Sequence, residues 1–156
     1  RLLSRGLGDV YKRQKSYFEK DENFFMTYGD GLCSINLNDL TNFHKKNGKI
    51  ATVTAVHPPV RFGELEIQGD KVTKFEEKPQ ASAGWINGGY FVLNSDVFDY
   101  IDNDQTLFEK EPMTRLYQKN NLNAYKHEGF WKCMDTLRDK IDLEQILKDK
   151  GAIWKK

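Results

Sequence analysis

FFMTYGDG at residues 24–31 is a short apolar run that ends in two glycines around an aspartate. Such runs are typical of buried strands that lead into a turn. A second run, IATVTAV at residues 50–56, is rich in β-branched residues, as expected of a strand buried on both faces. Between them lies a helical stripe that Asn36 is expected to cap and Gly48 to end. Strand, helix and strand in this order predict a βαβ unit and a parallel sheet.

The chain beyond this unit continues to alternate strands with helices. Residues 63–77 predict an antiparallel hairpin around a glycine-containing loop, and WINGGYFVL at residues 85–93 predicts a further strand. A last helix is expected to begin after Thr136. We therefore expect an α/β fold with a Rossmann-like, mainly parallel sheet that contains the strands near residues 24–28, 50–56 and 85–93, together with an antiparallel hairpin.

The first residues differ from the rest. Segment 1–14, RLLSRGLGDVYKRQ, has no sustained period and resembles translated sequencing-adaptor sequence. We expect it to be non-native or disordered, and the prediction of the fold rests on residues 15–156.

Composition excludes several classes of function. The chain of 156 residues has 24 basic and 23 acidic side chains. This balance argues against binding to nucleic acid or to an anionic membrane, which needs an excess of positive charge. No apolar run approaches the roughly 18 residues needed to span a bilayer. Cys33 and Cys133 do not make a disulfide framework, so free thiols with inert packing roles in a reducing cytoplasm are expected.

Two aspartates follow predicted strands. Asp30 lies between glycines at the end of the first strand, and Asp135 lies between an aromatic-rich strand and a helix start. Ligands bind at the carboxyl ends of strands in open α/β sheets, and Mg²⁺ is typically held by one or two carboxylates plus phosphates. From spacing alone, ordinary turn or cap aspartates are the simpler interpretation, and spacing does not show that the two converge.

Other polar and glycine-containing segments have two interpretations each. In Glu77-Lys78-Pro79 the lysine suits a phosphate and the glutamate suits sugar hydroxyls, but the segment also fits a charged strand end. Asn87-Gly88-Gly89 interrupts a strand, which marks either a bulge or the close approach of a ligand, and the same holds for Gly63.

The three histidines do not predict a metal site. His44 lies on a lysine-rich helix and is expected to face solvent. His57 and His127 have no cysteine or histidine partner at metal-ligand spacing, which argues against zinc.

In order and spacing these segments resemble the sugar-1-phosphate nucleotidylyltransferases from about Tyr17 to Leu147. GWINGG at residues 84–89 and GFWKCMDT at residues 129–136 look like the cytidylyl branch rather than the thymidylyl or uridylyl branches. The other matching motifs are Thr27-Tyr28-Gly29-Asp30-Gly31, Phe43-His44-Lys45, residues 51–56, Pro58-Pro59, Arg61-Phe62-Gly63, residues 75–79, residues 125–128 and residues 137–139.

The resemblance implies transfer of a cytidylyl group from CTP to glucose 1-phosphate, giving CDP-glucose and pyrophosphate for polysaccharide biosynthesis. It implies that Asp30 and Asp135 bind Mg²⁺ and that Lys78 holds the sugar phosphate. These three residues form the implied catalytic set, in a protein expected to be a homo-oligomer when complete. The implied substrate-binding set is Gly63, Glu77, Asn87 and Gly88.

One departure from the family pattern limits this expectation. The family's glycine-rich nucleotide loop should precede the strand at Phe24, and nothing before Tyr17 resembles it. The chain is therefore expected to be the C-terminal, sugar-binding portion of an incomplete nucleotidyltransferase domain, inactive by itself. A thymidylyl- or uridylyltransferase of the same family, or a non-catalytic paralogue, remains an alternative.

Overall fold

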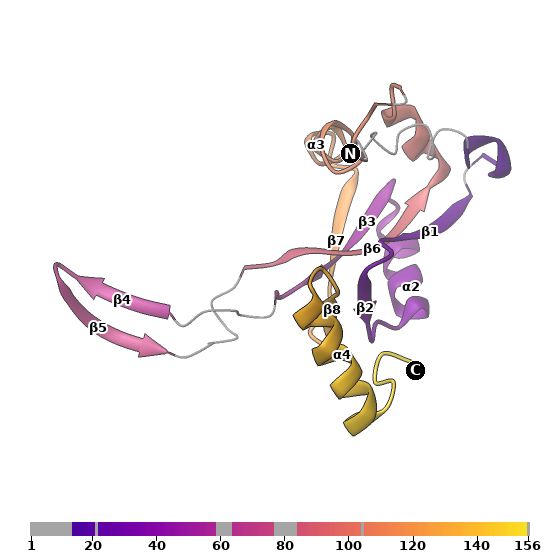
Figure 1. Ribbon diagram of the computed structural model, residues 1–156. Helices are drawn as coiled ribbons and strands as arrows, with labels where there is room; N and C mark the ends of the chain where they lie inside the picture. Colours follow the sequence, from indigo (N-terminus) through magenta and orange to yellow (C-terminus); the bar gives the residue numbers. More distant parts are fainter. Residues whose placement is uncertain (1–13, 21, 59–63, 77–83, 104, 156) are drawn as a thin grey trace. The chain divides into compact units, whose positions relative to one another are not determined.

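The computed structural model describes residues 14–20, 22–58, 64–76, 84–103 and 105–155 (Figure 1). The expectation for segment 1–14 therefore falls almost wholly outside the described residues. The strands are β1 (Asn23–Thr27), β2 (Gly31–Cys33), β3 (Ala51–Val56), β4 (Glu64–Gln68), β5 (Lys71–Glu76), β6 (Ile86–Asn94), β7 (Leu122–Lys126) and β8 (Trp131–Cys133). The helices are α2 (Leu37–Asn47), α3 (Glu111–Gln118) and α4 (Leu137–Lys150), with 3₁₀ turns η1 (Lys15–Tyr17) and η2 (Ser95–Tyr100).

Four strands form one sheet in the order β1-β6-β3-β7. β3 is an interior strand and five of its six residues are buried, as its unbroken β-branched run predicts. The three strands expected to share a sheet do so, and the α/β class and the β4–β5 hairpin are confirmed.

The direction of β6 departs from the expected mainly parallel arrangement. β6 runs antiparallel to β1, and Asn94 N donates to Ile50 O at 2.7 Å, so the end of β6 lies beside the start of β3. The physical reason lies in the connection. A parallel neighbour needs a crossover that carries the chain back to the starting end of the strand. The connection from β3 to β6 instead contains a hairpin whose outer ends, Glu64 and Glu76, lie opposite each other. β6 therefore starts at the end where β3 stops.

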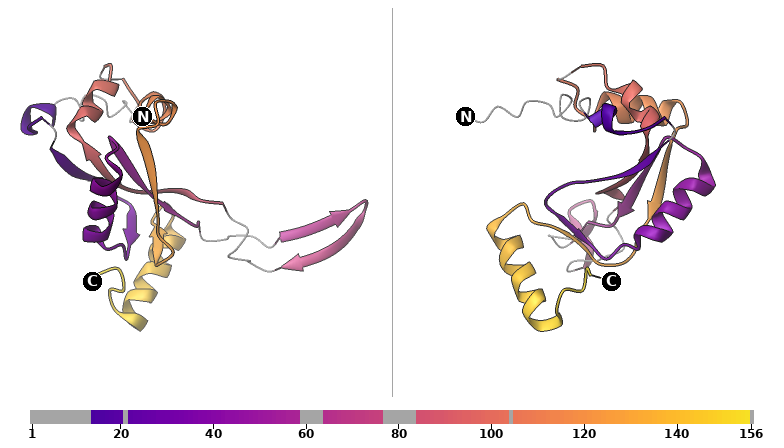
Figure 2. Two further views of the ribbon diagram at one scale, coloured as in Figure 1. Left: turned by 180° about the vertical axis from the view of Figure 1, so that it is seen from behind. Right: turned by 90° about the vertical axis from the view of Figure 1, so that its right-hand side faces the viewer.

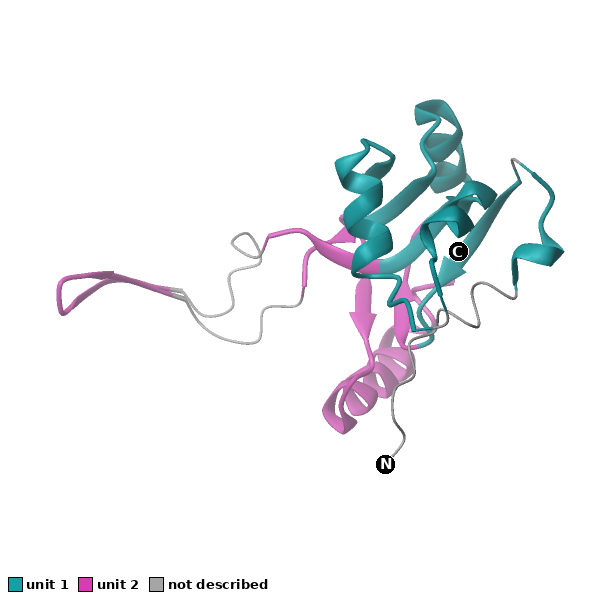
Figure 3. Cartoon of the chain, turned by 90° about the horizontal axis from the view of Figure 1, so that it is seen from above, with its two compact units in different colours: residues 1–29, 36–54, 89–126 teal, residues 30–35, 55–88, 127–156 magenta. Residues whose placement is uncertain are grey.

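The chain forms two compact units (Figure 3). Unit 1 comprises residues 1–29, 36–54 and 89–126, and unit 2 comprises residues 30–35, 55–88 and 127–156.

Aromatic rings fill much of the core of unit 1. Phe18 stacks on Phe24 with ring centroids 4.2 Å apart, and Phe24 stacks on Phe98 at 5.5 Å. Phe91 meets Phe108 edge-on at 5.9 Å, and both side chains are buried. Such ring pairs stabilise a core beyond the apolar area that they bury.

Helix α2 lies along one face of the sheet in unit 1 (Figure 2). Its bounds follow the sequence signals, because the Asn36 side chain accepts from two backbone N–H groups and Gly48 closes the helix in a left-handed conformation. Leu40 is fully buried, and Phe43 packs edge-on against Tyr125 of β7.

The expectation that His44 faces solvent is wrong. The side chain is only 2% exposed, and its Nδ1 lies 2.9 Å from Thr52 Oγ1. Its Nε2 lies 3.2 Å from Asn23 Oδ1. Burial lowers the pKa of His44, because it disfavours the charged imidazolium. The neighbouring lysines suggested an exposed face, but His44 lies one turn after Leu40 on the buried face.

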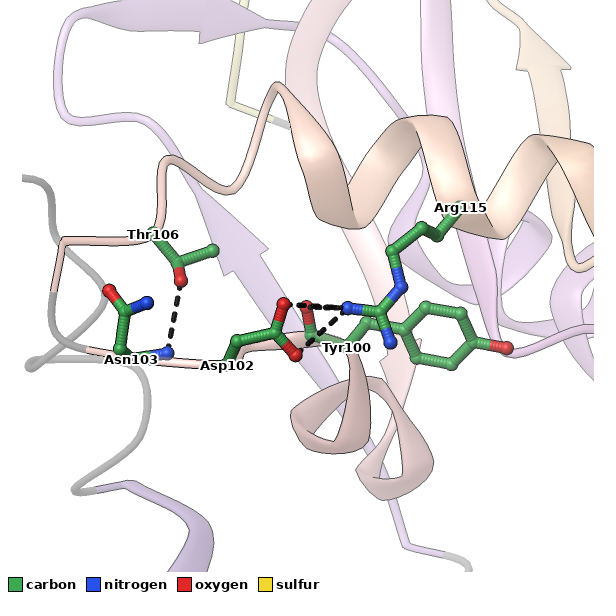
Figure 4. Close-up of polar contacts among 5 residues, drawn as sticks. All are labelled: Tyr100, Asp102, Asn103, Thr106 and Arg115. Atoms are coloured by element: carbon green, nitrogen blue, oxygen red, sulfur yellow. Dashed lines mark hydrogen bonds and ion pairs between the residues drawn. The ribbon is translucent and has the colours of Figure 1, made fainter.

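A polar cluster in unit 1 ties α3 to the segment that follows η2 (Figure 4). Arg115 Nη1 donates to both carboxylate oxygens of Asp102 at 3.0 Å, and its guanidinium lies 5.2 Å from the centre of the Tyr100 ring. Asn103 N donates to Thr106 Oγ1 at 3.1 Å. Because all of these contacts are internal to the fold, we assign the cluster a structural role.

In unit 2, the β4–β5 hairpin pairs Leu65 with Phe75 and Ile67 with Val72. The register of the two strands shifts by an irregularity between Glu66 and Ile67. All four of these apolar side chains are about half exposed or more. Helix α4 begins after Thr136, as predicted, and its start is fixed by a Thr136–Asp139 capping box. In the part of the chain that the structure describes, no helix is long and apolar enough to cross a membrane.

Gly89 provides a test of packing inside β6. Its φ of +77° is unfavourable for other residues, and an added Cβ would lie 2.7 Å from Cδ2 and 3.1 Å from Cγ of Tyr28. Gly48→Ala also places a Cβ at a positive φ, but there it meets no other atom, so the variant should lose about 1–2 kcal/mol of stability. Gly89→Ala should cost about 1–3 kcal/mol more, because the ring must also move.

Urea unfolding of the variants measures both costs. Gly29→Ala is the matched control, since Gly29 has open space around it, and its stability should stay within about 0.5 kcal/mol of wild type. Equal costs for Gly89→Ala and Gly48→Ala would contradict the steric part of this account.

His44 predicts a loss of stability in mild acid. The folded pKa is below the unfolded value of about 6.5, so the unfolded chain binds more protons in the interval between them. The free energy of unfolding should therefore fall as the pH drops from about 7 through 6.5 and below. In His44→Gln this part of the acid dependence should vanish, as measured by urea midpoints between pH 7.5 and 5.5. Identical pH profiles for the two proteins would refute the assignment.

Candidate active site

A short antiparallel ladder in unit 2 places the two candidate aspartates at one of its ends. β2 pairs with β8, with Gly31 opposite Cys133. The ladder continues one step further, because Met134 N donates to Asp30 O at 2.9 Å. Asp30 thus lies beside Met134, and Asp135 follows directly. Both aspartates are exposed and occupy the same end of the ladder.

The Asp135 backbone and side chain are held locally. Cys133 Sγ donates to Asp135 Oδ2 at 3.1 Å. On the other side, Thr136 N donates to Asp139 Oδ2 at 3.0 Å, and Thr136 Oγ1 accepts from Asp139 N in return. The carboxylate therefore follows a fixed strand and precedes a fixed helix start.

The opposite end of the ladder is closed by Ser34. Ser34 N donates to Phe130 O at 2.9 Å, and Phe130 N donates back to Ser34 Oγ at 3.0 Å. His127 Nε2 lies 3.5 Å from Ser34 Oγ and 3.3 Å from Phe130 O. A Cβ at Gly129 would lie within 2.8 Å of both His127 and Ser34, so only glycine fits between them. We assign this cluster to the packing of the loop before β8.

The Asn87-Gly88 segment is attached to the same ladder. Trp131 Nε1 donates to Gly88 O at 2.8 Å. Asn87 is exposed and Gly88 is buried. Gly89 meets the Tyr28 side chain and its backbone carbonyl accepts from Tyr28 N at 2.9 Å, so the second glycine of the pair has a packing explanation.

Three predicted site residues, Gly63, Glu77 and Lys78, lie outside the described residues, and their roles stay predictions. His57 precedes the first of the two undescribed segments, 59–63, and Trp85 follows the second, 77–83. The rings of His57 and Trp85 pack with centroids 3.9 Å apart.

The two cysteines are free thiols on the ladder. Burial raises the pKa of Cys33. Burial also raises the pKa of Cys133 to about 11, together with the hydrogen bond to Asp135 and the charges of Asp135 and Asp139. Neither thiol is therefore activated as a nucleophile at neutral pH.

Comparison with known proteins shows the family of the chain. Residues 3–149 match the family described as nucleotidyl transferase. The chain belongs to this family.

The family relatives share much of the sequence. A glucose-1-phosphate cytidylyltransferase from Salmonella typhi is 49% identical over 95% of the chain, and the chain spans 58% of that relative's length. A probable glucose-1-phosphate cytidylyltransferase from Bacillus subtilis (strain 168) is 40% identical over 86% of the chain and 53% of its own length.

A solved structure is similar in fold. The putative glucose-1-phosphate thymidylyltransferase from Bacillus anthracis, in complex with a sucrose, superposes with a TM-score of 0.69. The superposition covers 94% of this chain and 63% of that one, at 19% identity.

The donor set of this nucleotidyl transferase chain suits a hard cation. Asp30 and Asp135 offer exposed carboxylate oxygens at one end of the ladder. No cluster of three or more metal-binding side chains occurs among the described residues. A pair is sufficient for Mg²⁺, which takes its remaining ligands from water and phosphates.

Sequence reasoning missed two side chains of β8 that fix parts of the candidate site, because Trp131 Nε1 donates to Gly88 O and Cys133 Sγ donates to Asp135 Oδ2. Trp131 and Cys133 alternate along β8 and therefore point to one face of the ladder, but their partners are distant or depend on the turn after the strand. Their place in the GFWKCMDT segment at residues 129–136 could have pointed to them, but that segment was used only as evidence of the family resemblance.

The Cys133–Asp135 contact predicts a slow thiol. At pH 7.5 with EDTA present, iodoacetamide should alkylate Cys133 much more slowly than a free cysteine, because little thiolate is present. Asp135→Asn should raise the rate several-fold by removing a negative charge, as followed by mass spectrometry. Asp149→Asn, at the far end of α4, is the control and should change nothing. Equal alkylation rates in both variants would contradict the assigned contact.

Proposed function

We propose that the longer protein containing this chain transfers a cytidylyl group from CTP to glucose 1-phosphate, releasing CDP-glucose and pyrophosphate. The observation that carries the proposal is the Met134–Asp30 hydrogen bond, which puts the two candidate metal carboxylates at the same end of one ladder. The relative that is 49% identical over 95% of the chain bears the name of this activity.

The described residues would act mainly by holding the reactants. Asp30 and Asp135 would bind Mg²⁺ with carboxylate oxygens, and Asn87 with the backbone at Gly88 would contact the glucose ring. When bound, Mg²⁺ neutralises negative charge on the phosphates.

Residues 63, 77 and 78 would complete the site. Lys78 would hold the sugar phosphate as a point charge. Glu77 would accept hydrogen bonds from sugar hydroxyls, and the backbone of Gly63 would contact the same ring.

The reaction requires no covalent step on the protein. An oxygen of glucose 1-phosphate attacks the α-phosphorus of CTP, and the bond from this phosphorus to the oxygen of pyrophosphate breaks. Catalysis then comes from orientation and from electrostatic stabilisation. The raised pKa of Cys133 is consistent with this chemistry, because no thiolate nucleophile is used.

The cytidylyl assignment has competitors within the family. The structural neighbour named as a thymidylyltransferase is only 19% identical and supports the fold alone. Relatives named mannose-1-phosphate guanyltransferase reach 37% identity over 71% of the chain. The higher identity and coverage of the cytidylyltransferases favour CTP.

The setting of the activity is also part of the proposal. We expect a cytoplasmic enzyme, in keeping with the two free thiols, and a homo-oligomer when the protein is complete.

Asp135→Asn tests the metal-binding role in the full-length protein. It removes one negative charge and almost no volume, so kcat for CDP-glucose formation should fall by about 10²–10³-fold while the fold is kept. Asp30→Asn should act similarly. The measurement is pyrophosphate release with saturating CTP, glucose 1-phosphate and Mg²⁺, alongside a circular dichroism melt.

Asp149→Asn serves as the charge-matched control and should keep the wild-type rate. An Asp135→Asn variant with unchanged kcat would overturn the metal assignment. A wild-type protein that is inactive with CTP and glucose 1-phosphate, yet active with another nucleotide or sugar phosphate, would overturn the substrate assignment.

A further inference from the structure

The indole of Trp131 joins two parts of the candidate site that are distant in sequence. Its Nε1 donates to Gly88 O at 2.8 Å across a separation of 43 positions. An indole N–H is a donor only, and Gly88 is buried, so this bond satisfies a carbonyl that has little access to water. Loss of the donor would leave that carbonyl under-satisfied.

The donor itself is rigidly placed. Trp131 lies opposite Cys33 in the β2–β8 ladder, next to the closure formed by Ser34 and Phe130. The Trp131 backbone is therefore fixed independently of Gly88. The side chain is only partly exposed, which limits the alternative positions of its ring.

The acceptor belongs to a glycine pair inside β6, where the residue type itself restrains the backbone little. Gly88 and Gly89 are adjacent, and glycine has access to more backbone conformations than any other residue. A hydrogen bond to the Gly88 carbonyl fixes the orientation of the planar peptide group that joins the two glycines. Asn87, one residue earlier, is exposed and belongs to the proposed sugar-binding set.

We infer that Trp131 is a positioning residue that holds the Asn87-Gly88 segment in the conformation that binds the sugar. This inference rests on the proposed function, and it assigns to the tryptophan a role in sugar affinity rather than in the chemical step. The two aspartates are held separately, by the Met134–Asp30 bond and the Thr136–Asp139 capping box. Loss of the indole N–H should therefore act on one substrate only.

Trp131→Phe in the full-length protein tests the inference. It keeps an aromatic ring and removes the N–H donor. KM for glucose 1-phosphate should rise about 5- to 30-fold, the range expected for one lost hydrogen bond to a buried carbonyl. kcat and KM for CTP should stay within about threefold of wild type, and the Mg²⁺ dependence should not change.

Trp154→Phe is the matched control. Trp154 also belongs to unit 2 and stacks on Phe130 at 5.9 Å, but its ring has no part in the Gly88 contact. This variant should keep the wild-type KM for glucose 1-phosphate. If Trp131→Phe lowers kcat and raises both KM values together, or leaves the KM for the sugar phosphate unchanged, the inference is wrong.

A second measurement uses the unmodified protein and does not depend on the folding of a variant. In ¹⁵N-labelled full-length protein, sequence-specific assignment separates the indole N–H signal of Trp131 from those of the other tryptophans. The Trp131 indole N–H should exchange slowly with solvent, and its exchange should slow further on addition of glucose 1-phosphate but not of Mg²⁺ alone. Rapid exchange of this N–H, or no response to glucose 1-phosphate, would refute the role of Trp131.

The two levels of the proposal can fail separately. A wild-type protein that makes no CDP-glucose refutes the proposed function. A wild type that makes CDP-glucose, together with a Trp131→Phe variant of unchanged sugar affinity, refutes only the positioning role.

Discussion

The candidate site depends on a few backbone hydrogen bonds between strands that are remote in sequence. The bond from Phe130 N to Ser34 Oγ spans 96 positions, and the paired residues of β2 and β8 are separated by a similar distance. The entropic cost of closing such a loop grows only slowly with the length of the loop. Contacts formed after closure must still offset that cost. Three paired positions, extended at each end by Asp30 and Ser34, provide those contacts.

Local capping complements this long-range pairing. The Thr136–Asp139 box starts α4 immediately after Asp135, and the Asn36 side chain starts α2 soon after Cys33. Each strand of the ladder is therefore followed closely by a helix whose start is fixed by its own side chains. For Asp135, which lies between β8 and α4 and is exposed, this combination limits the freedom of the backbone that carries the carboxylate.

The elements that the sequence predicted well are those determined by near neighbours. The Asn36 cap, the Gly48 end, the buried run of β3 and the β4–β5 hairpin all depend on residues within one turn or one loop. The direction of β6 was not foreseen, because it depends on where the hairpin returns the chain. His44 was misassigned because its partners Thr52 and Asn23 come from two strands, and helical periodicity carries no information about them. For the same reason the convergence of Asp30 and Asp135 was only a hypothesis at the level of sequence, and neither the Met134–Asp30 bond nor the indole contact with Gly88 was predicted.

The division into two units also bears on how the protein folds as it is made. The chain passes from one unit to the other at residues 29/30, 35/36, 54/55, 88/89 and 126/127, so neither unit is a continuous stretch. Unit 1 is complete only when β7 has emerged from the ribosome, and the ladder of unit 2 only when β8 has followed. At about 5–20 residues per second, β2 waits about 5–20 s for its partner strand. During this time its backbone N–H and C=O groups have no ladder partner, which makes the nascent chain a natural substrate for chaperones.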